Sequence, residues 1–303
     1  LFWVFTSYRP QSRPQYPGPT LIVNQGDTVT ITLTNRLPVP VSMVFPGHVA
    51  TAAGGSQGLI TREVPAYNQA AGDPAVTYTF TATHPGTFAY HSGTRPELQV
   101  EMGLVGAIVV RPAGFNPAAP TAYNHPGTAY DVEHLFVLSE MDPRIHDLIE
   151  LYGSTVGLAV LGQTHYLSDY FSNYWFINGR NAPDTLAAAG TALFPTQPYN
   201  SLPRMNPGQK VLMRVVSVGR EGHPFHHHGN HARIIGKDGR MLQSTSGAGP
   251  DLSDEVFTIA GVPGETVDAL FEWTGKGMGW DLSGTGPEHQ HTCNGVPVDS
   301  AIP

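Results

Sequence analysis

Short segments in which apolar and polar residues alternate recur along the chain, and proline or glycine bounds most of them. In Thr28–Thr34, the apolar residues Val29, Ile31 and Leu33 alternate with threonines. A period of two places successive side chains on opposite faces of an extended strand, so this segment predicts a strand with one buried and one solvated face. Comparable segments are Thr20–Asn24, Val76–Thr81, Gly86–His91, Gly103–Val110 and Glu133–Ser139. The pattern indicates an all-β chain.

Helical periodicity is confined to short insertions. The best candidate is Pro143–Tyr152, where apolar residues recur at helical spacing after Asp142. The composition agrees, because 34 glycines, 27 prolines and only 13% charged residues are typical of a β-rich protein with many turns. Leu1–Phe5 is predicted as a further strand. Glu97, Gln99 and Glu101 alternate as on a strand, whose face is either solvated or lines a cation path or an oligomer contact.

The two halves of the chain resemble each other. Asn24–Asn35 and Asn206–Ser217 each begin with a glycine turn and continue as an alternating strand. Thr83–Tyr90 and Val262–Leu270 add a second Pro-Gly strand to each half, in the same order. This repetition predicts two tandem β-sandwiches, with a first domain at 1–112, a linker at 113–129 and a second domain at 130–303. The irregular tail suggests that the second domain is incomplete at its C-terminus and that the chain is a segment of a longer one.

Charge and hydropathy exclude several classes of function. The formal net charge is −8 and no Lys/Arg cluster is present, which argues against nucleic-acid binding. No apolar run reaches the roughly 18 residues of a membrane-spanning helix.

Cys293 is the one cysteine of the chain, so it cannot form an internal disulfide. Whether it pairs outside this chain or is a free surface thiol stays open.

A dense histidine cluster is the strongest chemical signal. The stretch from His223 to His231 contains five of the fourteen histidines, and neutral imidazole is the commonest metal ligand of proteins. On an extended strand, His226 and His228 project from the same face and form half of a tetrahedral or trigonal nitrogen-donor site. His227 has the other parity. The alternative is a histidine-rich strand that caps a polar cavity without metal.

The motif His223-Pro-Phe-His-His-His-Gly229 resembles the His-Pro-x-His-x-His-Gly motif of multicopper oxidases. Other segments match this family in the same order: Tyr16–Thr20, Gln25–Asp27, Leu33–Asn35, Gly86–Ser92 and Gly103–Val110 in its first domain, and Phe176–Arg180 and Lys237–Arg240 in its second. The resemblance implies two tandem cupredoxin-like Greek-key β-sandwiches with short helical insertions, and copper as the cofactor. The metal ligands that it implies are His91, His223, His226 and His228, with His231 as a nearby candidate.

The first half departs from the family pattern. Where the family has His-Trp-His-Gly, this chain reads Val44-Phe-Pro-Gly47, with His48 as a nearby substitute, and where the family has His-Ser-His it reads His91-Ser-Gly93. If this half derives from a type-1 copper domain, Ser92 stands near the place of the cysteine, with Met102 downstream. Serine cannot supply the thiolate of a blue copper site.

Two functions are therefore expected from different classes. The first is a multicopper-oxidase-like copper-binding protein that acts as an oxidoreductase with a reduced copper complement, for which no catalytic residue can yet be assigned. The alternative is a non-catalytic cupredoxin-fold structural or binding module of an extracellular or cell-surface assembly. The resemblance also implies a homo-oligomer and an extracellular, periplasmic or cell-surface location.

Overall fold

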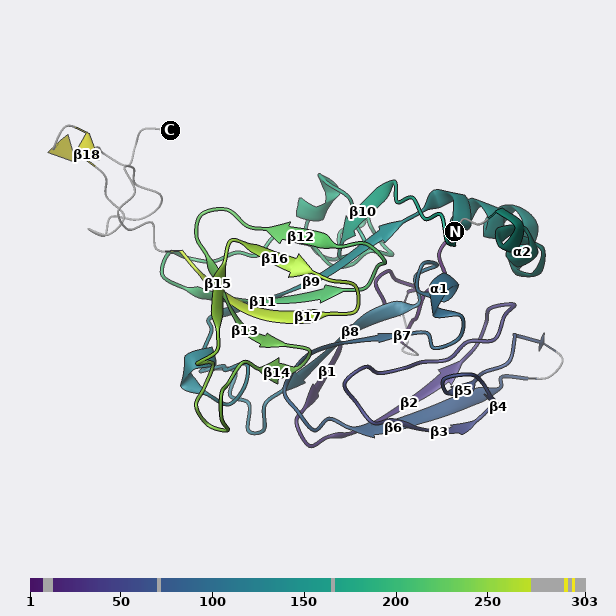
Figure 1. Ribbon diagram of the computed structural model, residues 1–303, viewed down its shortest axis with the longest axis horizontal. Coiled ribbons are helices and arrows are strands. Elements are labelled where there is room, and N and C mark those ends of the chain that lie inside the picture. Colours follow the sequence, from purple (N-terminus) through teal and green to yellow (C-terminus); the bar gives the residue numbers. More distant parts are fainter. Residues whose placement is uncertain (8–12, 70–71, 165–166, 274–291, 294–295, 298–303) are drawn as a thin grey trace.

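The chain folds into stacked layers of β-strands (Figure 1). The computed structural model describes residues 1–7, 13–69, 72–164, 167–273, 292–293 and 296–297. The layers of the first half are a sheet in the order β2 (Thr28–Thr34), β6 (Ala75–Thr81), β3 (Thr51–Gly54) and a sheet in the order β1 (Leu21–Asn24), β8 (Val105–Arg111), β7 (Gly86–His91). A short hairpin joins β4 (Ser56–Gln57) to β5 (Arg62–Glu63).

The alternating pattern determines which face of β2 is buried. Its threonines are exposed, whereas Val29, Ile31 and Leu33 are partly buried and pack against the core of the first half. Across the ladder these three residues pair with Phe80, Tyr78 and Val76 of β6, which are almost completely buried. Because a strand exposes every second residue, one sequence period positions the whole sheet over its core.

The second half contains a larger sheet, covered by a hairpin-like pair of strands. The sheet has the order β10 (Tyr174–Ile177), β9 (Val132–Met141), β11 (Lys210–Ser217), β17 (Thr266–Glu272), β13 (Ala232–Lys237), β14 (Arg240–Met241), and β15 (Asp254–Val256) pairs with β13. The covering pair is β12 (His223–His226) with β16 (Thr258–Gly261). Phe136, Phe225 and Ile259 lie in the core between these two layers.

Helical segments lie outside the layers. They are α1 (Pro96–Gln99), α2 (Pro143–Thr164) and the 3₁₀ turns at Pro126–Thr128 and Asp184–Leu186. Two short strands, β18 (Thr292–Cys293) and β19 (Val296–Pro297), pair with each other. The predicted helix at Pro143–Tyr152 is confirmed, and it continues past a non-helical Gly153. No helix in the described part of the chain is long and apolar enough to cross a membrane.

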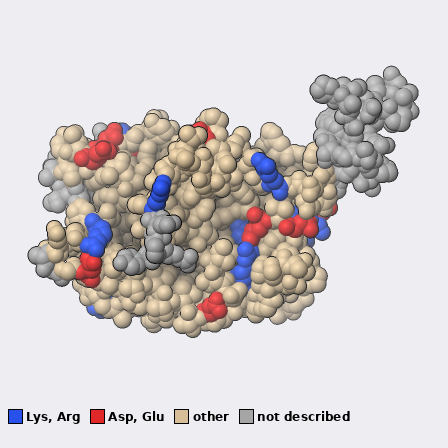
Figure 2. Space-filling view, turned by 180° about the vertical axis from the view of Figure 1, so that it is seen from behind, with Lys and Arg blue, Asp and Glu red and all other residues tan. Residues whose placement is uncertain are grey.

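An apolar seam joins the two halves. Ala89 and Val105 of the first half pack with Val137, Val216 and Val218 of the second. In Figure 1 this seam lies between the β7–β8 layer and the β9–β11–β17 layer. On the face in Figure 2, charged side chains are few and most of the surface is uncharged.

Buried charges bridge the same seam. Arg214 of β11 is fully buried and donates hydrogen bonds to Thr87 of β7 and to Glu133 of β9. Thr87 in turn donates to Asp268 of β17, and so does Tyr123. Because a buried charge is tolerated only when it is paired and hydrogen-bonded, this network fixes how the halves meet.

Two expectations for local structure are wrong. Leu1–Phe5 is not part of a β-ladder, although Trp3 donates a backbone hydrogen bond to Met102 at 2.7 Å and both Trp3 and Phe5 are buried. The side chains of Trp3 and Phe5 lie in the core of the first half rather than on a sheet face, whereas Leu1 is exposed. The stretch with Glu97, Gln99 and Glu101 is not a strand but α1 and the turn after it, because Pro96 opens a helical turn there. The domain boundaries at 112 and 130 stay a prediction.

Candidate metal centre

The histidine motif begins on β12 and continues into a loop. His223 pairs with Gly261 and His226 with Thr258, and the ladder ends at His226. Gly229 has a φ of +98°, a left-handed conformation that only glycine adopts readily, and β13 begins at Ala232. The prediction that an extended strand carries both His226 and His228 is therefore wrong for His228, which follows the end of the strand.

The rings of His226 and His228 nevertheless lie together. Their centroids are 4.9 Å apart and both side chains are exposed. His226 Nδ1 is 3.0 Å from the hydroxyl of Thr258, the residue paired with it across the ladder. When Nδ1–H donates to this hydroxyl, the lone pair is on Nε2, which is the arrangement by which a hydrogen bond orients a ligand histidine. The pair therefore fits two imidazole ligands of one copper ion.

His231 borders this pair through an aromatic side chain. The His231 ring lies 5.7 Å from the ring of Phe257 and the His226 ring lies 5.9 Å from it, both edge to face. Phe257 is itself 58% exposed. Phe257 thus lies between His231 and the His226–His228 pair. His227 is half-buried and packs edge to face on Phe271, and its two buried ring nitrogens have no hydrogen-bond partner among the described residues.

His223 points to a different environment. It is buried, its Nε2 is 2.6 Å from Glu140 Oε2, and its ring packs edge to face on Trp175. Glu140 is 4% exposed and also accepts the backbone N–H groups of Arg220 and Glu221. A carboxylate that holds Nε2 leaves Nδ1 as the nitrogen available to a metal.

His91 ends β7 at the seam between the halves. Its Nδ1 is 2.9 Å from the carbonyl oxygen of Ser92, which can only accept, so Nδ1 carries the proton and Nε2 the lone pair. Burial lowers the pKa of His91, an effect that the hydrogen bond to Ser92 partly offsets. Neutral His91 lines a cavity, and Glu101 and Glu140 are among the other residues that line it.

His48 is packed as an aromatic residue. Its ring lies 4.6 Å from the ring of Phe80 and 4.4 Å from that of Phe88. Both ring nitrogens are buried and have no hydrogen-bond partner among the described residues. Burial, and to a smaller extent the neighbouring His84 and Arg240, lower the pKa of His48 to about 4. The ring is therefore neutral at pH 7 and surrounded by phenylalanine.

The surroundings of Ser92 do not fit a type-1 copper. Ser92 donates a 2.6 Å hydrogen bond to Gln99 Oε1, and its own oxygen accepts the backbone N–H of Thr94. Thr94 donates to Ser42 Oγ at 2.9 Å. All four side chains are buried, and the atoms that they present are hydroxyl and amide groups already bonded to one another. A blue site needs a thiolate and two imidazoles, and Met102 is packed in the core.

The five predicted ligands are thus divided among several places. His226 and His228 form a pair with His231 nearby, whereas His223 is tied to Glu140 and His91 lies at the seam. Within the described residues, no three His, Cys, Asp or Glu side chains are grouped to hold a metal ion. Sequence reasoning missed Glu140, although a carboxylate directly after the apolar run of β9 was a usable signal.

The comparisons with known proteins agree with this architecture. Residues 13–114 match the family model described as multicopper oxidase. The chain is 27% identical over 251 residues to a probable nitrite reductase-hydroxylamine oxidoreductase fusion protein of Kuenenia stuttgartiensis, covering 82% of this chain and 24% of that protein. It is 29% identical to the copper-containing nitrite reductase of Alcaligenes xylosoxydans xylosoxydans, covering 86% of this chain and 70% of the relative.

A solved structure extends the likeness to the fold. The blue copper oxidase from Nitrosomonas europaea superimposes with a TM-score of 0.58 at 20% identity, over 87% of this chain and 68% of that one. The chain spans only about a quarter of the Kuenenia fusion protein. The predicted fold class, tandem cupredoxin-like sandwiches with short helical insertions, is confirmed. The chain is thus similar to multicopper oxidases over residues 13–114, and its described residues have a cupredoxin-type fold.

Proposed function

We propose that this chain is a copper-binding protein of the multicopper-oxidase kind with a reduced copper complement. Copper is the cofactor expected of a member of this family. In the proposal, His226 and His228 hold one copper ion, His231 stands beside them, and the first half holds no type-1 copper. The observation that carries the proposal is the exposed imidazole pair with ring centroids 4.9 Å apart.

The chemistry of the two halves supports this division. Imidazole suits copper, and copper bound by nitrogen and oxygen ligands keeps open positions for a substrate or dioxygen. The hydroxyl and amide groups around Ser92 offer neither thiolate nor imidazole. His223 and His91 each have one nitrogen fixed by an acceptor and the other left with its lone pair, so each could complete a site with ligands from elsewhere.

Copper titration of the intact chain tests the proposal. His226→Ala and His228→Ala should each weaken Cu²⁺ binding by at least about tenfold, because even the loss of a residue that only orients a ligand weakens metal binding by that amount. His84 is an exposed histidine of the first half, so His84→Ala is the matched control and should leave the affinity unchanged. Equal affinities in all variants would contradict the proposal.

Whether the copper is catalytic is a separate part of the proposal. We expect the copper-loaded chain to oxidise a reductant such as a phenol, with dioxygen or, as the names of the relatives suggest, nitrite as the electron acceptor. The alternative is a non-catalytic binding module. It is favoured by the polar groups around Ser92, which bond to one another. Copper-dependent consumption of either acceptor, lost in His226→Ala, supports the enzyme; tight copper binding without turnover supports the module.

Assembly, location and domain division belong to the same proposal. The edge strand β10 presents the exposed aromatic side chains of Tyr174 and Trp175, and exposed edges favour pairing between chains. We expect a homo-oligomer, which light scattering of the purified chain would test. An extracellular, periplasmic or cell-surface location, and domains divided near 112 and 130, rest on the family resemblance.

A further inference from the structure

A third imidazole lies close to the proposed copper pair of His226 and His228. His231 is exposed and follows His228 by three positions in the chain. Within the described residues, no three His, Cys, Asp or Glu side chains are grouped to hold a metal ion, so His231 does not join the pair. A copper ion with two protein nitrogens keeps coordination positions that a third imidazole would partly fill.

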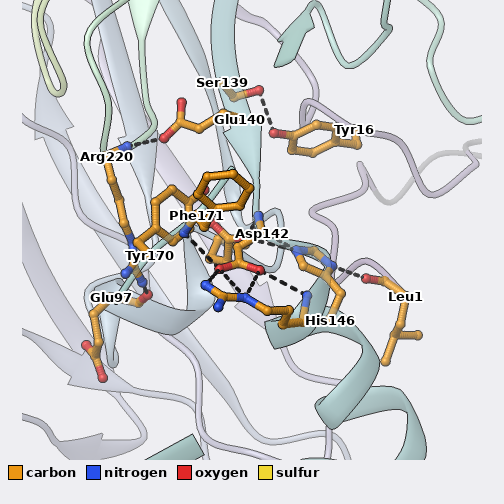
Figure 3. A network of polar contacts seen from close by, with 12 residues as sticks. Leu1, Tyr16, Glu97, Ser139, Glu140, Asp142, His146, Tyr170, Phe171 and Arg220 are labelled. Atoms are coloured by element: carbon orange, nitrogen blue, oxygen red, sulfur yellow. Dashed lines mark hydrogen bonds and ion pairs between the residues drawn. The ribbon is translucent and has the colours of Figure 1, made fainter. Parts of the chain in front are cut away.

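The other two histidines of the motif are held by their own surroundings. The Nε2 of His223 is 2.6 Å from Glu140, and Figure 3 shows that Glu140 is itself bonded to Arg220. The ring nitrogens of His227 are buried. The side chain of His231 is exposed, and it makes no hydrogen bond within the described part of the chain. His231 is therefore the histidine whose approach to the pair has to be explained.

One aromatic side chain separates His231 from the pair. The ring of Phe257 lies 5.9 Å from the ring of His226 at an interplanar angle of 83°. It lies 5.7 Å from the ring of His231 at 84°, so both imidazoles meet it edge to face. The Phe257 ring thus occupies the space through which the His231 ring would have to move to share a metal ion with His226.

The backbone on both sides of Phe257 is fixed to the histidine segment. The residue before it, in β15, pairs with Ala232, and the residue after it, in β16, pairs with His226. The carbonyl oxygen of Phe257 accepts the N–H of His227 at 3.3 Å. Because these ladders tie Phe257 to the chain before and after His231, its ring stays between the two imidazoles.

We propose that Phe257 is a positioning residue that limits the copper ion to two imidazoles, by keeping His231 out of its coordination sphere. The inference rests on the proposed function, because it concerns the same copper ion. Phe257 supplies no ligand atom and acts through the place that it leaves to His231. The positions that remain open on the copper are then available to an external ligand.

Copper titration and electron paramagnetic resonance of two single variants test the proposal. His231→Ala should leave the Cu²⁺ affinity and the nitrogen hyperfine pattern of the parent unchanged, because His231 is not a ligand there. Phe257→Ala should add a third nitrogen to the pattern. It should also raise the affinity by at least about tenfold, since gaining a ligand should count for no less than losing a residue that only orients one.

Three further variants show whether the effect belongs to the Phe257 ring and to His231. Phe257→Ala/His231→Ala should return to the hyperfine pattern and affinity of the parent. Phe257→Trp keeps an aromatic ring in the same place and should also behave as the parent does. Leu252 is 57% exposed, close to the 58% of Phe257, so Leu252→Ala is the matched control and should change neither quantity.

The outcomes distinguish this inference from the proposed function. Loss of a nitrogen or weaker copper binding in His231→Ala would overturn the role of Phe257 and leave a copper site standing. A folded Phe257→Ala variant, checked by thermal unfolding, with the pattern and affinity of the parent would do the same. Copper binding that is unchanged in His226→Ala/His228→Ala would instead contradict the proposed function and, with it, this inference.

Discussion

Single residues show most clearly how this chain differs from a complete copper oxidase. Ser92 could be named from the sequence as the residue near the place of a cysteine, because the neighbouring motif is readable. Its bond to Gln99, seven positions along the chain, depends on the turn of α1, and the bond between Thr94 and Ser42 joins residues 52 positions apart, so neither could be predicted from the local pattern. Through those bonds, Ser92 is part of a buried cluster of polar side chains that bond to one another.

Restoring the cysteine alone should not restore a blue site. Ser92→Cys places a thiol among Ser42, Thr94 and Gln99, none of which supplies an imidazole. We expect the copper-treated variant to lack an intense absorption band at about 600 nm, the signature of a copper–thiolate centre. The visible spectrum before and after copper addition checks this. A strong new band would mean that the surroundings of Ser92 still form a type-1 site.

His48 should make the fold sensitive to mild acid. Its folded-state pKa of about 4 lies below the ordinary 6.5, so the unfolded chain binds the proton more readily. The stability contribution of neutral His48 is complete above pH 6.5 and is lost as the pH falls towards 4. His48→Phe should flatten this part of the curve and, by removing two unpartnered ring nitrogens, stabilise the fold by about 1 kcal/mol at pH 7.

Chemical denaturation at a series of pH values measures both effects of His48→Phe. His84 is exposed, but slight desolvation and the nearby Arg240 also lower its pKa, so some dependence on pH should remain in the variant. A stability curve for His48→Phe that is parallel to that of the parent from pH 6.5 to 4 would show that His48 is not held neutral by its packing.

At the scale of elements, the strand pattern was predictable and the connections were not. The alternation in Thr28–Thr34 reproduces β2, and the apolar run from Glu133 lies within β9. Two features overrode the local pattern: Pro96 turned an apparent strand into α1, and the β12 ladder ended before His228. Both depend on where the chain must turn to reach its next partner strand. The local periodicity of the sequence gives no information about that position.

The contact between β9 and β12 should be important for stability. Glu140→Ala removes the acceptor of His223 and of two backbone N–H groups in a buried place. We expect a loss of about 2–3 kcal/mol, the cost of leaving buried donors unsatisfied. Glu255→Ala, an exposed acid on β15, is the matched control and should change stability by less than about 0.5 kcal/mol. Equal, small effects in urea denaturation would contradict this role of Glu140.

At the scale of the molecule, the seam decides what the tandem fold can do. The repetition of the two halves predicted two sandwiches, but not that Arg214, Asp268 and Thr87 would join them through buried hydrogen bonds. Neither did it predict that His91 would face the seam while His226 and His228 face solvent. In the sequence, His91, His226 and His228 all match copper-ligand motifs of one family. Only the folded chain shows that they lie in different places.

Acid should loosen the seam through Glu133. Burial alone raises the pKa of Glu133, but Arg214 and Arg111 outweigh this and lower it below its ordinary 4.5. A depressed carboxyl pKa gives stability that is present above pH 4.5 and is lost as the pH falls through the folded-state pKa. Glu133→Gln should therefore be less stable at pH 7 and show a smaller further loss below pH 4.5. Identical acid limbs for parent and variant in thermal unfolding would contradict this.

The central claim is that this chain holds copper on an exposed histidine pair and not in a blue site. Electron paramagnetic resonance and the visible spectrum of the copper-titrated chain test it together. The account predicts one tightly bound Cu²⁺ per chain with nitrogen hyperfine structure, lost in His226→Ala/His228→Ala, and no intense band at about 600 nm. A blue band in the parent chain, or a copper signal unchanged in the double variant, would contradict it.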